Sequence, residues 1–138
     1  LFGIKDDTAR AVETNLRTPS SPYYLGKRFE TMLSFAGDSI DEERYQRITS
    51  TKDHTYTCLY TALYIKQIEA AWNKKGFSVI TKPDIVATLW NLGFAKSQPK
   101  KDPKSGGSVL TINGKDHSFG SLAYDFYYSD EMIELFPR

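Results

Sequence analysis

The feature that most constrains this chain is a long, mostly apolar segment between His54 and Lys75, which reads HTYTCLYTALYIKQIEAAWNKK. Apolar residues recur along it at helical spacing, and charge appears inside it only at Lys66, Glu69 and the final turn. A helix that is apolar on nearly every side is normally buried. The segment therefore predicts a central helix with the other helices of a domain packed around it. The stripe expected to face the core consists of Cys58, Ala62, Ile65, Ile68 and Trp72, with Leu59, Tyr60, Leu63 and Tyr64 covering most of the remaining surface.

Helix-capping residues bound this segment and predict a second helix after it. Thr51 or Asp53 can cap the start of the central helix, and Gly76 supplies the residue type that usually closes a helix in the left-handed conformation. The second helix follows a capping segment, with Asp in the place where a capping box usually has Glu, and ends at Gly93. The capping segment is Thr81-Lys82-Pro83-Asp84, and the apolar positions after it are Ile85, Val86, Leu89 and Leu92.

Three further helices are predicted before the central one. The first begins at Asp6-Asp7-Thr8 and continues to Leu16, because Thr18-Pro19 stops the run. The second follows the cap Ser20-Ser21-Pro22 and ends at Gly37, with Gly26 as a weak point inside it. Its apolar stripe is Leu25, Phe29, Met32, Leu33 and Ala36. The third is a polar surface helix that begins near Asp38 and has apolar residues at Ile40, Tyr45 and Ile48.

After the central pair of helices, the pattern changes to a loop, a hairpin and a final helix. The segment 97–107 is rich in Lys, Pro and Gly and predicts an exposed loop. Asn113-Gly114 lies between two short β-prone runs and predicts a type I′ turn, since both residues tolerate positive φ. An aromatic helix over 120–128 and a last turn that includes Phe136 complete a mainly α fold around the central buried helix, with one small β-hairpin.

Composition narrows the functional classes. The chain has 138 residues, the size of one ordinary domain. Its net charge is +1, and the sequence contains no long run of charges of one sign. We therefore expect no nucleic-acid partner, and no run reaches the roughly 20 apolar residues of a membrane span. The single cysteine, Cys58, excludes an internal disulfide and is expected to be a small core residue. His54 and His117 lack a spaced set of further ligands, so we expect no metal site and no cofactor.

The segment from Asp53 to Gly93 resembles the C-terminal half of the lysozyme-like lytic transglycosylase domain of the soluble-lytic-transglycosylase and goose-type-lysozyme superfamily. The motifs that carry the resemblance are Tyr60-Thr61-Ala62-Leu63-Tyr64-Ile65-Lys66, which is similar to the family's N-I-x-x-G-x-x-Y-L helix, and Ala87-Thr88-Leu89-Trp90-Asn91-Leu92-Gly93, which is similar to its A-x-Y-N-x-G element. Trp90 stands where the family usually has Tyr. Phe119-Gly120-Ser121-Leu122-Ala123 is similar to the short helix that closes the domain. We therefore expect residues 1–138 to form one lysozyme-like domain that lacks its N-terminal part.

The resemblance implies cleavage of peptidoglycan glycan strands in the periplasm or outside a bacterial cell. In the family, one catalytic Glu protonates the glycosidic oxygen and then acts as a base while the muramyl 6-hydroxyl closes onto the anomeric carbon. Such an acid needs a raised carboxyl pKa, which an apolar pocket supplies. By the same resemblance, Trp90 and Asn91 would line the pocket as an aromatic surface and an amide donor. Tyr60 and Tyr64, one helical turn apart, would extend it.

The sequence departs from the family pattern at the catalytic acid. The family's Glu is followed by Ser and by a downstream Gly-[Leu or Tyr]-Met-Gln segment, and neither is recognised here. Glu30, between Phe29 and Thr31, is the one acid in an apolar helical setting early in the chain and is the catalytic candidate within it. The other expectation is that the acid precedes Leu1, either in the same chain or in a bound N-terminal fragment of the same protein.

Each of these residues also has an ordinary structural explanation. Asn91 before Gly93 is often only a helix end, Trp90 can be a core residue, and Glu30 can pair in solvent with Lys27 or Arg28. Two other functional classes therefore stay open. One is a non-catalytic helical module that binds glycan or protein, and the other is an interaction subunit of a secretion or injection apparatus.

Overall fold

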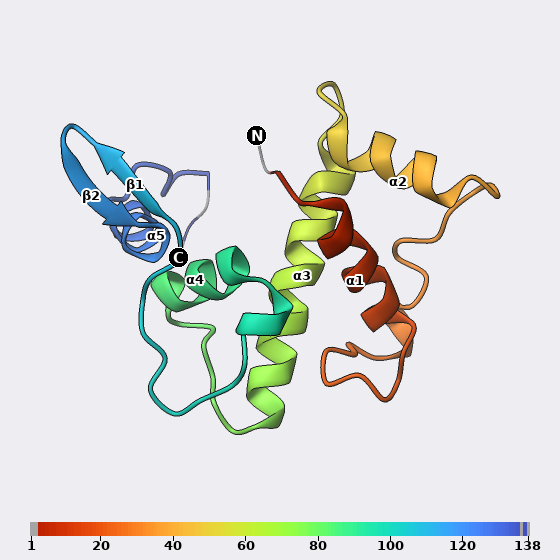
Figure 1. Cartoon of the computed structure of the whole chain (residues 1–138), viewed down its shortest axis with the longest axis horizontal. Coiled ribbons are helices and arrows are strands. Elements are labelled where there is room, and N and C mark those ends of the chain that lie inside the picture. Colours follow the sequence, from red (N-terminus) through yellow and green to blue (C-terminus); the bar gives the residue numbers. More distant parts are fainter. Residues whose placement is uncertain (1–2, 136, 138) are drawn as a thin grey trace. The chain divides into compact units, whose positions relative to one another are not determined.

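The computed structural model describes residues 3–135 and 137, and over these residues the fold is mainly α-helical, with five α-helices and one two-stranded antiparallel hairpin (Figure 1). This confirms the expected fold class at that level. The chain forms two compact units, which cover residues 1–74 and 75–138. The elements in order are α1 (Asp6–Leu16), η1 (Lys27–Phe29), α2 (Ile40–Thr49), α3 (Thr55–Lys74), α4 (Pro83–Leu92), η2 (Phe94–Lys96), β1 (Val109–Ile112), β2 (Lys115–Ser118) and α5 (Phe119–Tyr128).

The first unit is built around the long helix α3, against which α1 and α2 pack (Figure 1). As predicted, α3 starts just after Asp53, whose Oδ1 accepts a hydrogen bond from Thr55 N at 2.9 Å, and ends before Gly76, which has φ +81°. Gln67 ties the helices together, because its Nε2 donates to the carbonyl of Val12 in α1 at 3.0 Å. The buried residues of α3 are Thr57, Tyr60, Leu63, Tyr64, Gln67, Ile68, Ala71 and Trp72.

This buried side differs from the stripe expected from the sequence. Cys58 is exposed, so its prediction as a core residue was wrong, and Ala62 is exposed as well. The face that turns inward carries Tyr60 and Gln67, and both of these polar side chains have hydrogen-bond partners on α1. Buried polar pairs thus help to determine which side of α3 faces the core, and a prediction from apolar spacing alone does not include them.

The predicted helix over 22–36 was also wrong, since only the short η1 forms there. Gly26 has φ +104°, outside the helical region. Beyond it, two carbonyl groups that a helix would use internally accept side-chain bonds instead. Arg17 donates to Leu33 O at 3.2 Å, and Arg47 donates to Ser34 O at 2.7 Å. The segment is therefore a loop held by arginines.

Helix α2 forms where it was expected, but its inward residues are charged. Ile40 and Tyr45 are exposed, while Arg44 and Arg47 are buried. The ring of Phe35 lies under both guanidinium groups, 5.5 Å from the Cζ of Arg44 and 4.5 Å from that of Arg47. Cation–π contacts of this kind give a buried guanidinium a favourable electrostatic interaction in place of part of its hydration.

The second unit consists of α4, α5 and the hairpin. Asn113 and Gly114 have φ of 51° and 76°, as a type I′ turn requires, so the predicted hairpin is confirmed. The register pairs Val109 with Ser118 and Ile112 with Lys115. Ser118 then caps α5, because its Oγ accepts a hydrogen bond from Ser121 N.

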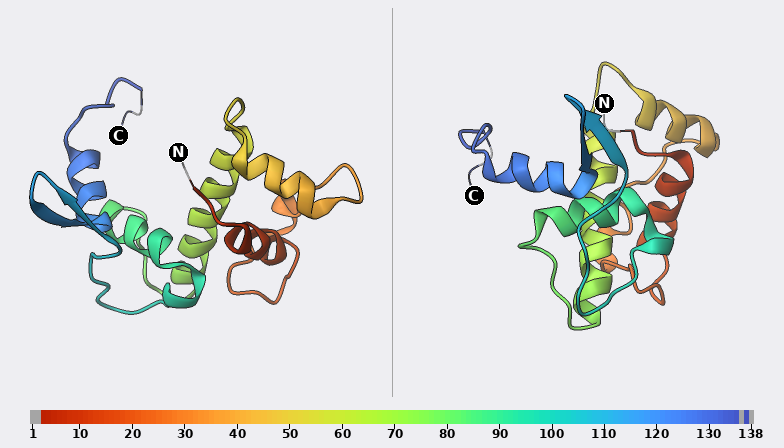
Figure 2. Two further views of the ribbon diagram at one scale, coloured as in Figure 1. Left: turned by 45° about the horizontal axis from the view of Figure 1, so that its top comes forward. Right: turned by 60° about the vertical axis from the view of Figure 1, so that its left-hand side comes forward.

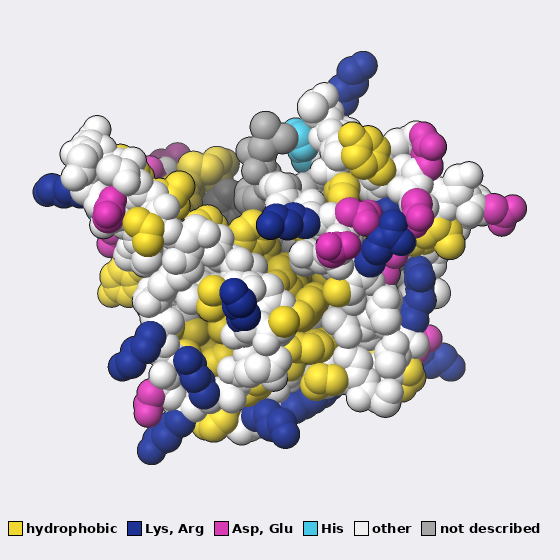
Figure 3. Space-filling view, viewed as in Figure 1, with side chains coloured by type: hydrophobic (Ala, Val, Ile, Leu, Met, Phe, Trp, Pro, Cys, Tyr) yellow, Lys and Arg dark blue, Asp and Glu magenta, His cyan; other side chains and the backbone are white. Residues whose placement is uncertain are grey.

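Two segments of this unit lie at its surface. The loop between η2 and β1 is exposed at its lysines, and Figure 3 shows basic side chains over that region at the lower left of the view. These lysines are Lys100, Lys101 and Lys104, and the exposed Lys96 precedes them at the end of η2. After α5, residues 131–135 form turns, with Asp130 at φ +63°. Phe136, expected in this last turn, lies outside the described residues.

Candidate functional site

The C-terminal end of α4 places Trp90 and Asn91 in a corner of the second unit. The Trp90 ring stacks on Phe119 at the start of α5, with centroids 5.7 Å apart and planes inclined by 17°. Asn91 turns its Oδ1 toward the loop before β1 and accepts hydrogen bonds from Ser108 N at 2.7 Å and Ser108 Oγ at 3.1 Å. Both side chains are half-buried. The corner is therefore rigid and still open to solvent.

Close contact between α4 and α5 holds this corner in shape. Gly120 has no side chain to separate the helices, and a Cβ at that position would meet Thr88 Oγ1, Ser105 Oγ at 2.5 Å and the Asp84 carbonyl at 2.8 Å. Thr88 Oγ1 in turn accepts a hydrogen bond from Gly106 N at 2.9 Å. The loop 105–108 is thus fixed at both of its ends, to Thr88 and to Asn91. Its path leaves the amide of Asn91 at the rim of the corner.

Helix α5 carries an exposed group of tyrosines on the face that begins at Gly120. Tyr124, Tyr127 and Tyr128 follow Gly120 at spacings of four, seven and eight residues, and they are 45–50% exposed. Tyr124 and Tyr128 have ring centroids 4.6 Å apart, and Tyr127 meets Tyr128 edge-on at 5.0 Å. Figure 2 shows the later turns of α5 running past α4. We call these three residues the tyrosine face.

Tyr60 and Tyr64, predicted to contact substrate, lie instead in the core of the first unit. They are 0% and 2% exposed. Burial raises the pKa of Tyr60 above its usual value, and the hydrogen bond that its hydroxyl donates to Glu13 Oε1 at 2.6 Å acts in the same direction. Burial raises the pKa of Tyr64 to about 12. Neither ring presents a surface to a ligand in this structure.

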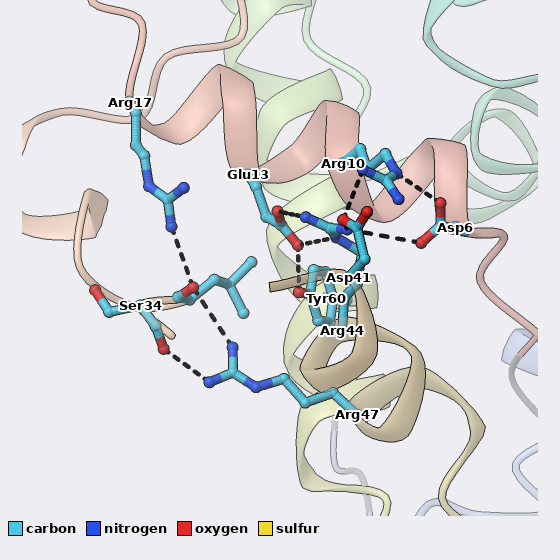
Figure 4. A network of polar contacts seen from close by, with 10 residues as sticks. Asp6, Arg10, Glu13, Arg17, Ser34, Asp41, Arg44, Arg47 and Tyr60 are labelled. Atoms are coloured by element: carbon cyan, nitrogen blue, oxygen red, sulfur yellow. Dashed lines mark hydrogen bonds and ion pairs between the residues drawn. The ribbon is translucent and has the colours of Figure 1, made fainter. Parts of the chain in front are cut away.

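The partner of Tyr60 belongs to a buried polar network that the sequence reading missed (Figure 4). Arg44 donates to both oxygens of Glu13 and, at 2.8 Å, to Asp41 Oδ1. Asp41 also contacts the exposed Arg10 at 2.9 Å. The two arginines lower the pKa of the Asp41 carboxyl, Arg44 having the larger effect, and Glu13 raises the pKa of Arg44. Both oxygens of Glu13 thus accept hydrogen bonds from Arg44, and one also accepts from Tyr60, which is typical of a structural carboxylate.

One sequence signal did point to Glu13. In α1 the buried residues are Ala9, Val12, Glu13 and Leu16, which is the spacing of a single helical face. A carboxylate on such a face requires a cation opposite it. Arg44 on α2 supplies that cation.

Glu30, the predicted catalytic acid, follows η1 and is half-buried. Its Oε1 accepts a hydrogen bond of 2.5 Å from the hydroxyl of Tyr24, and this bond raises the pKa of Tyr24. Glu30, Tyr60 and Tyr64 belong to the first unit, whereas Trp90 and Asn91 belong to the second. Tyr60 and Tyr64 lie one turn apart on α3, and Trp90 and Asn91 are neighbours at the end of α4.

Comparison with known proteins adds no family to these observations. No protein-family model matches the chain, and neither a curated protein nor a solved structure does. Within residues 3–135 and 137, no helix is both long and apolar enough to cross a membrane. In the same residues, no group of three or more His, Cys, Asp or Glu side chains is placed to hold a metal ion.

Proposed function

We propose that this chain acts on peptidoglycan as part of a lytic-transglycosylase-like protein, and that its second unit contacts the glycan strand. The observation that carries the proposal is the corner made by Trp90 and Asn91. It combines a half-buried indole with an amide whose oxygen is occupied by Ser108. The Asn91 Nδ2 group forms no hydrogen bond within the described residues and is left to donate to a sugar oxygen.

The tyrosine face supports the same proposal. Tyrosine joins a flat apolar ring, suited to the C–H face of a sugar, to a hydroxyl that bonds to sugar oxygens. Tyr128 contacts the rings of both Tyr124 and Tyr127, and the three residues, about half exposed, form a surface that a polar glycan strand can cover. The resemblance of segment 87–93 to the family element A-x-Y-N-x-G suggests peptidoglycan as the polymer that would bind there.

Cleavage, as distinct from binding, needs a carboxylic acid that protonates the glycosidic oxygen. Within the chain we propose Glu30 for this role, since Glu13 is held by Arg44 and Tyr60. Any catalytic proton transfer by Glu30 would have to break or use its bond to Tyr24. The Tyr24 hydroxyl would then be a positioning group for the acid.

The experiment is digestion of purified peptidoglycan, with the released fragments identified by mass spectrometry. Anhydro-muropeptides from the parent chain and none from a Glu30→Gln variant support cleavage with Glu30 as the acid. Sedimentation of the chain with peptidoglycan, without release of fragments, supports the glycan contact and excludes Glu30 as a catalytic acid in this chain. Absence of both contradicts the proposed function.

A protein-binding role is the second candidate, and one observation favours it. Exposed apolar residues also occur on α5 and in the turns that follow it, and these side chains have no hydroxyl for a sugar: Phe126, Met132, Ile133 and Leu135. Exposed apolar surface of this extent often marks an interface with another protein. A Phe126→Ser variant that still binds peptidoglycan, while a Tyr124→Ala variant does not, would favour glycan over protein.

A further inference from the structure

The corner where α2 meets α3 contains an open hollow of about 270 Å³ that none of the roles above uses. Its lining comes from one face of α2 and the loop after it, and from the start of α3. The lining residues are Glu43, Gln46, Arg47, Ser50, Asp53 and Tyr56. All six lie within the first unit.

Internal bonds fix the walls of this hollow before any ligand arrives. Asp53 N donates to Ser50 Oγ at 3.0 Å, and Asp53 Oδ1 accepts from Thr55 N. The guanidinium of Arg47 lies over the Tyr56 ring, 4.1 Å from its centroid. A site with fixed walls loses little conformational entropy when it binds a ligand.

Arg47 and Glu43, two charged residues of the lining, already form hydrogen bonds within the protein. Arg47 donates to Ser34 O and, at 2.5 Å, to Glu43 Oε1, while Glu43 Oε2 accepts from Ala36 N. Four other groups remain for a ligand. Some form no hydrogen bond within the described residues, and the others form bonds that leave a lone pair or a proton free. These groups are the amide oxygen of Gln46, the hydroxyl proton of Ser50, the hydroxyl of Tyr56 and the carboxylate of Asp53, which accepts from the backbone and the side chain of Thr55 and still has lone pairs left.

The charges and sizes of these groups select the ligand class. Two carboxylates against one arginine disfavour a phosphate or a carboxylate ligand. An amide, two hydroxyls and a carboxylate beside an aromatic ring match the hydroxyl groups of a neutral sugar. Pockets for drug-sized ligands start at roughly 300 Å³, so this hollow suits a single ring.

We propose that the hollow between α2 and α3 is a second saccharide site, which binds one neutral N-acetylhexosamine residue. This inference rests on the proposed function, because a glycan strand is the polymer that would supply the residue. Gln46 and Tyr56 accept and donate hydrogen bonds at its rim, and Asp53 accepts from a ring hydroxyl. The site adds affinity for glycan and takes no part in bond cleavage.

The test is a titration of the ¹⁵N-labelled full chain with the soluble tetramer of N-acetylglucosamine, followed by amide chemical shifts. Saturable shifts at Gln46, Ser50, Asp53 and Tyr56 are expected. A Gln46→Ala or Tyr56→Ala variant should weaken them about tenfold, the loss of one or two good contacts. Tyr45→Ala is the matched control, because Tyr45 is on the same helix, 64% exposed and outside the lining.

The remaining outcomes separate this inference from the proposed function. Shifts confined to residues 88–128 would keep the proposed function and overturn the second site. Absence of shifts throughout the chain would overturn both. Shifts at the lining residues with methylammonium chloride but not with the tetramer, abolished in an Asp53→Asn variant, would show a cation site and also overturn the inference. Gln46 is exposed, so its variant keeps the test valid if Tyr56→Ala fails to fold.

Discussion

The guanidinium of Arg44 donates two hydrogen bonds to the carboxylate of Glu13, from Nε to Oε1 at 2.8 Å and from Nη2 to Oε2 at 2.7 Å. Both side chains are about 5% exposed or less, and the Tyr60 hydroxyl completes the set. Removal of one partner of a buried pair leaves the other charge uncompensated, at a cost of about 3–5 kcal/mol. We therefore predict that Glu13→Gln lowers the free energy of unfolding by about that amount in urea denaturation.

Arg10→Ala is the control for this prediction. Arg10 is exposed, although it contacts Asp6 and Asp41 in the same network, and solvent screens such pairs. Its removal should change the urea midpoint far less than Glu13→Gln does. Equal effects of the two substitutions would mean that the pair of Glu13 and Arg44 does not hold α1 to α2.

The buried tyrosines predict a stability change at high pH. The Tyr64 hydroxyl has a usual pKa of 10.0, which burial raises to about 12 in the folded chain. The unfolded chain therefore loses this proton first, so the contribution of Tyr64 to the free energy of unfolding is full below pH 10 and falls as the pH rises toward 12. Tyr64→Phe should reduce that fall, and Tyr45→Phe, at an exposed position, should not. Identical slopes for all three chains, measured by urea unfolding between pH 9 and pH 11.5, would contradict this explanation.

Gly120 gives a test of how the second unit is packed. Alanine normally stabilises a helix relative to glycine by roughly 0.5–1 kcal/mol. At Gly120 the added Cβ would meet Thr88, Ser105 and the Asp84 carbonyl, so we predict that Gly120→Ala destabilises the unit by about 1–3 kcal/mol. In Gly106→Ala the new Cβ meets no atom within 4 Å, so thermal unfolding should change little. A stabilised Gly120→Ala variant would show that α4 and α5 are further apart.

Asn91 allows its structural and ligand-binding roles to be separated. Asn91→Asp keeps an oxygen for Ser108 N and removes the Nδ2 donor, whereas Asn91→Ala removes both. We predict that only Asn91→Ala loosens loop 105–108, seen as faster amide hydrogen exchange at Ser108. Both variants should lose affinity for peptidoglycan, about five- to tenfold for one hydrogen bond. Full affinity in Asn91→Asp would restrict Asn91 to holding the loop.

Local signals in the sequence predicted the elements well, and long-range polar contacts explain most of what they missed. Asn113-Gly114 specified the hairpin by its tolerance of positive φ, and Gly76 ended α3 for the same reason. The segment 22–36 has an apolar helical pattern, yet it is a loop because Arg17 and Arg47, distant in sequence, bind its carbonyl groups. No local pattern contains that information.

The predicted site shows the same division. Trp90 and Asn91 were found because they are neighbours in one short motif, and they do form one corner. Tyr60 was predicted to extend the substrate pocket, but it is buried and its hydroxyl donates to Glu13, which is 47 residues away in the sequence. The hollow between α2 and α3 was not predicted, since its lining residues form no local motif and come from two helices and the loop between them.

Sedimentation of the chain with purified peptidoglycan, comparing the parent with Tyr124→Ala and with Tyr45→Ala, tests whether the second unit contacts the glycan strand. Tyr124 belongs to the tyrosine face, whereas Tyr45 is an exposed tyrosine on α2. If the second unit contacts glycan, the parent and Tyr45→Ala sediment equally, and Tyr124→Ala stays several-fold more in solution. A parent chain that remains in the supernatant, or a Tyr124→Ala variant that sediments like the parent, would contradict the account.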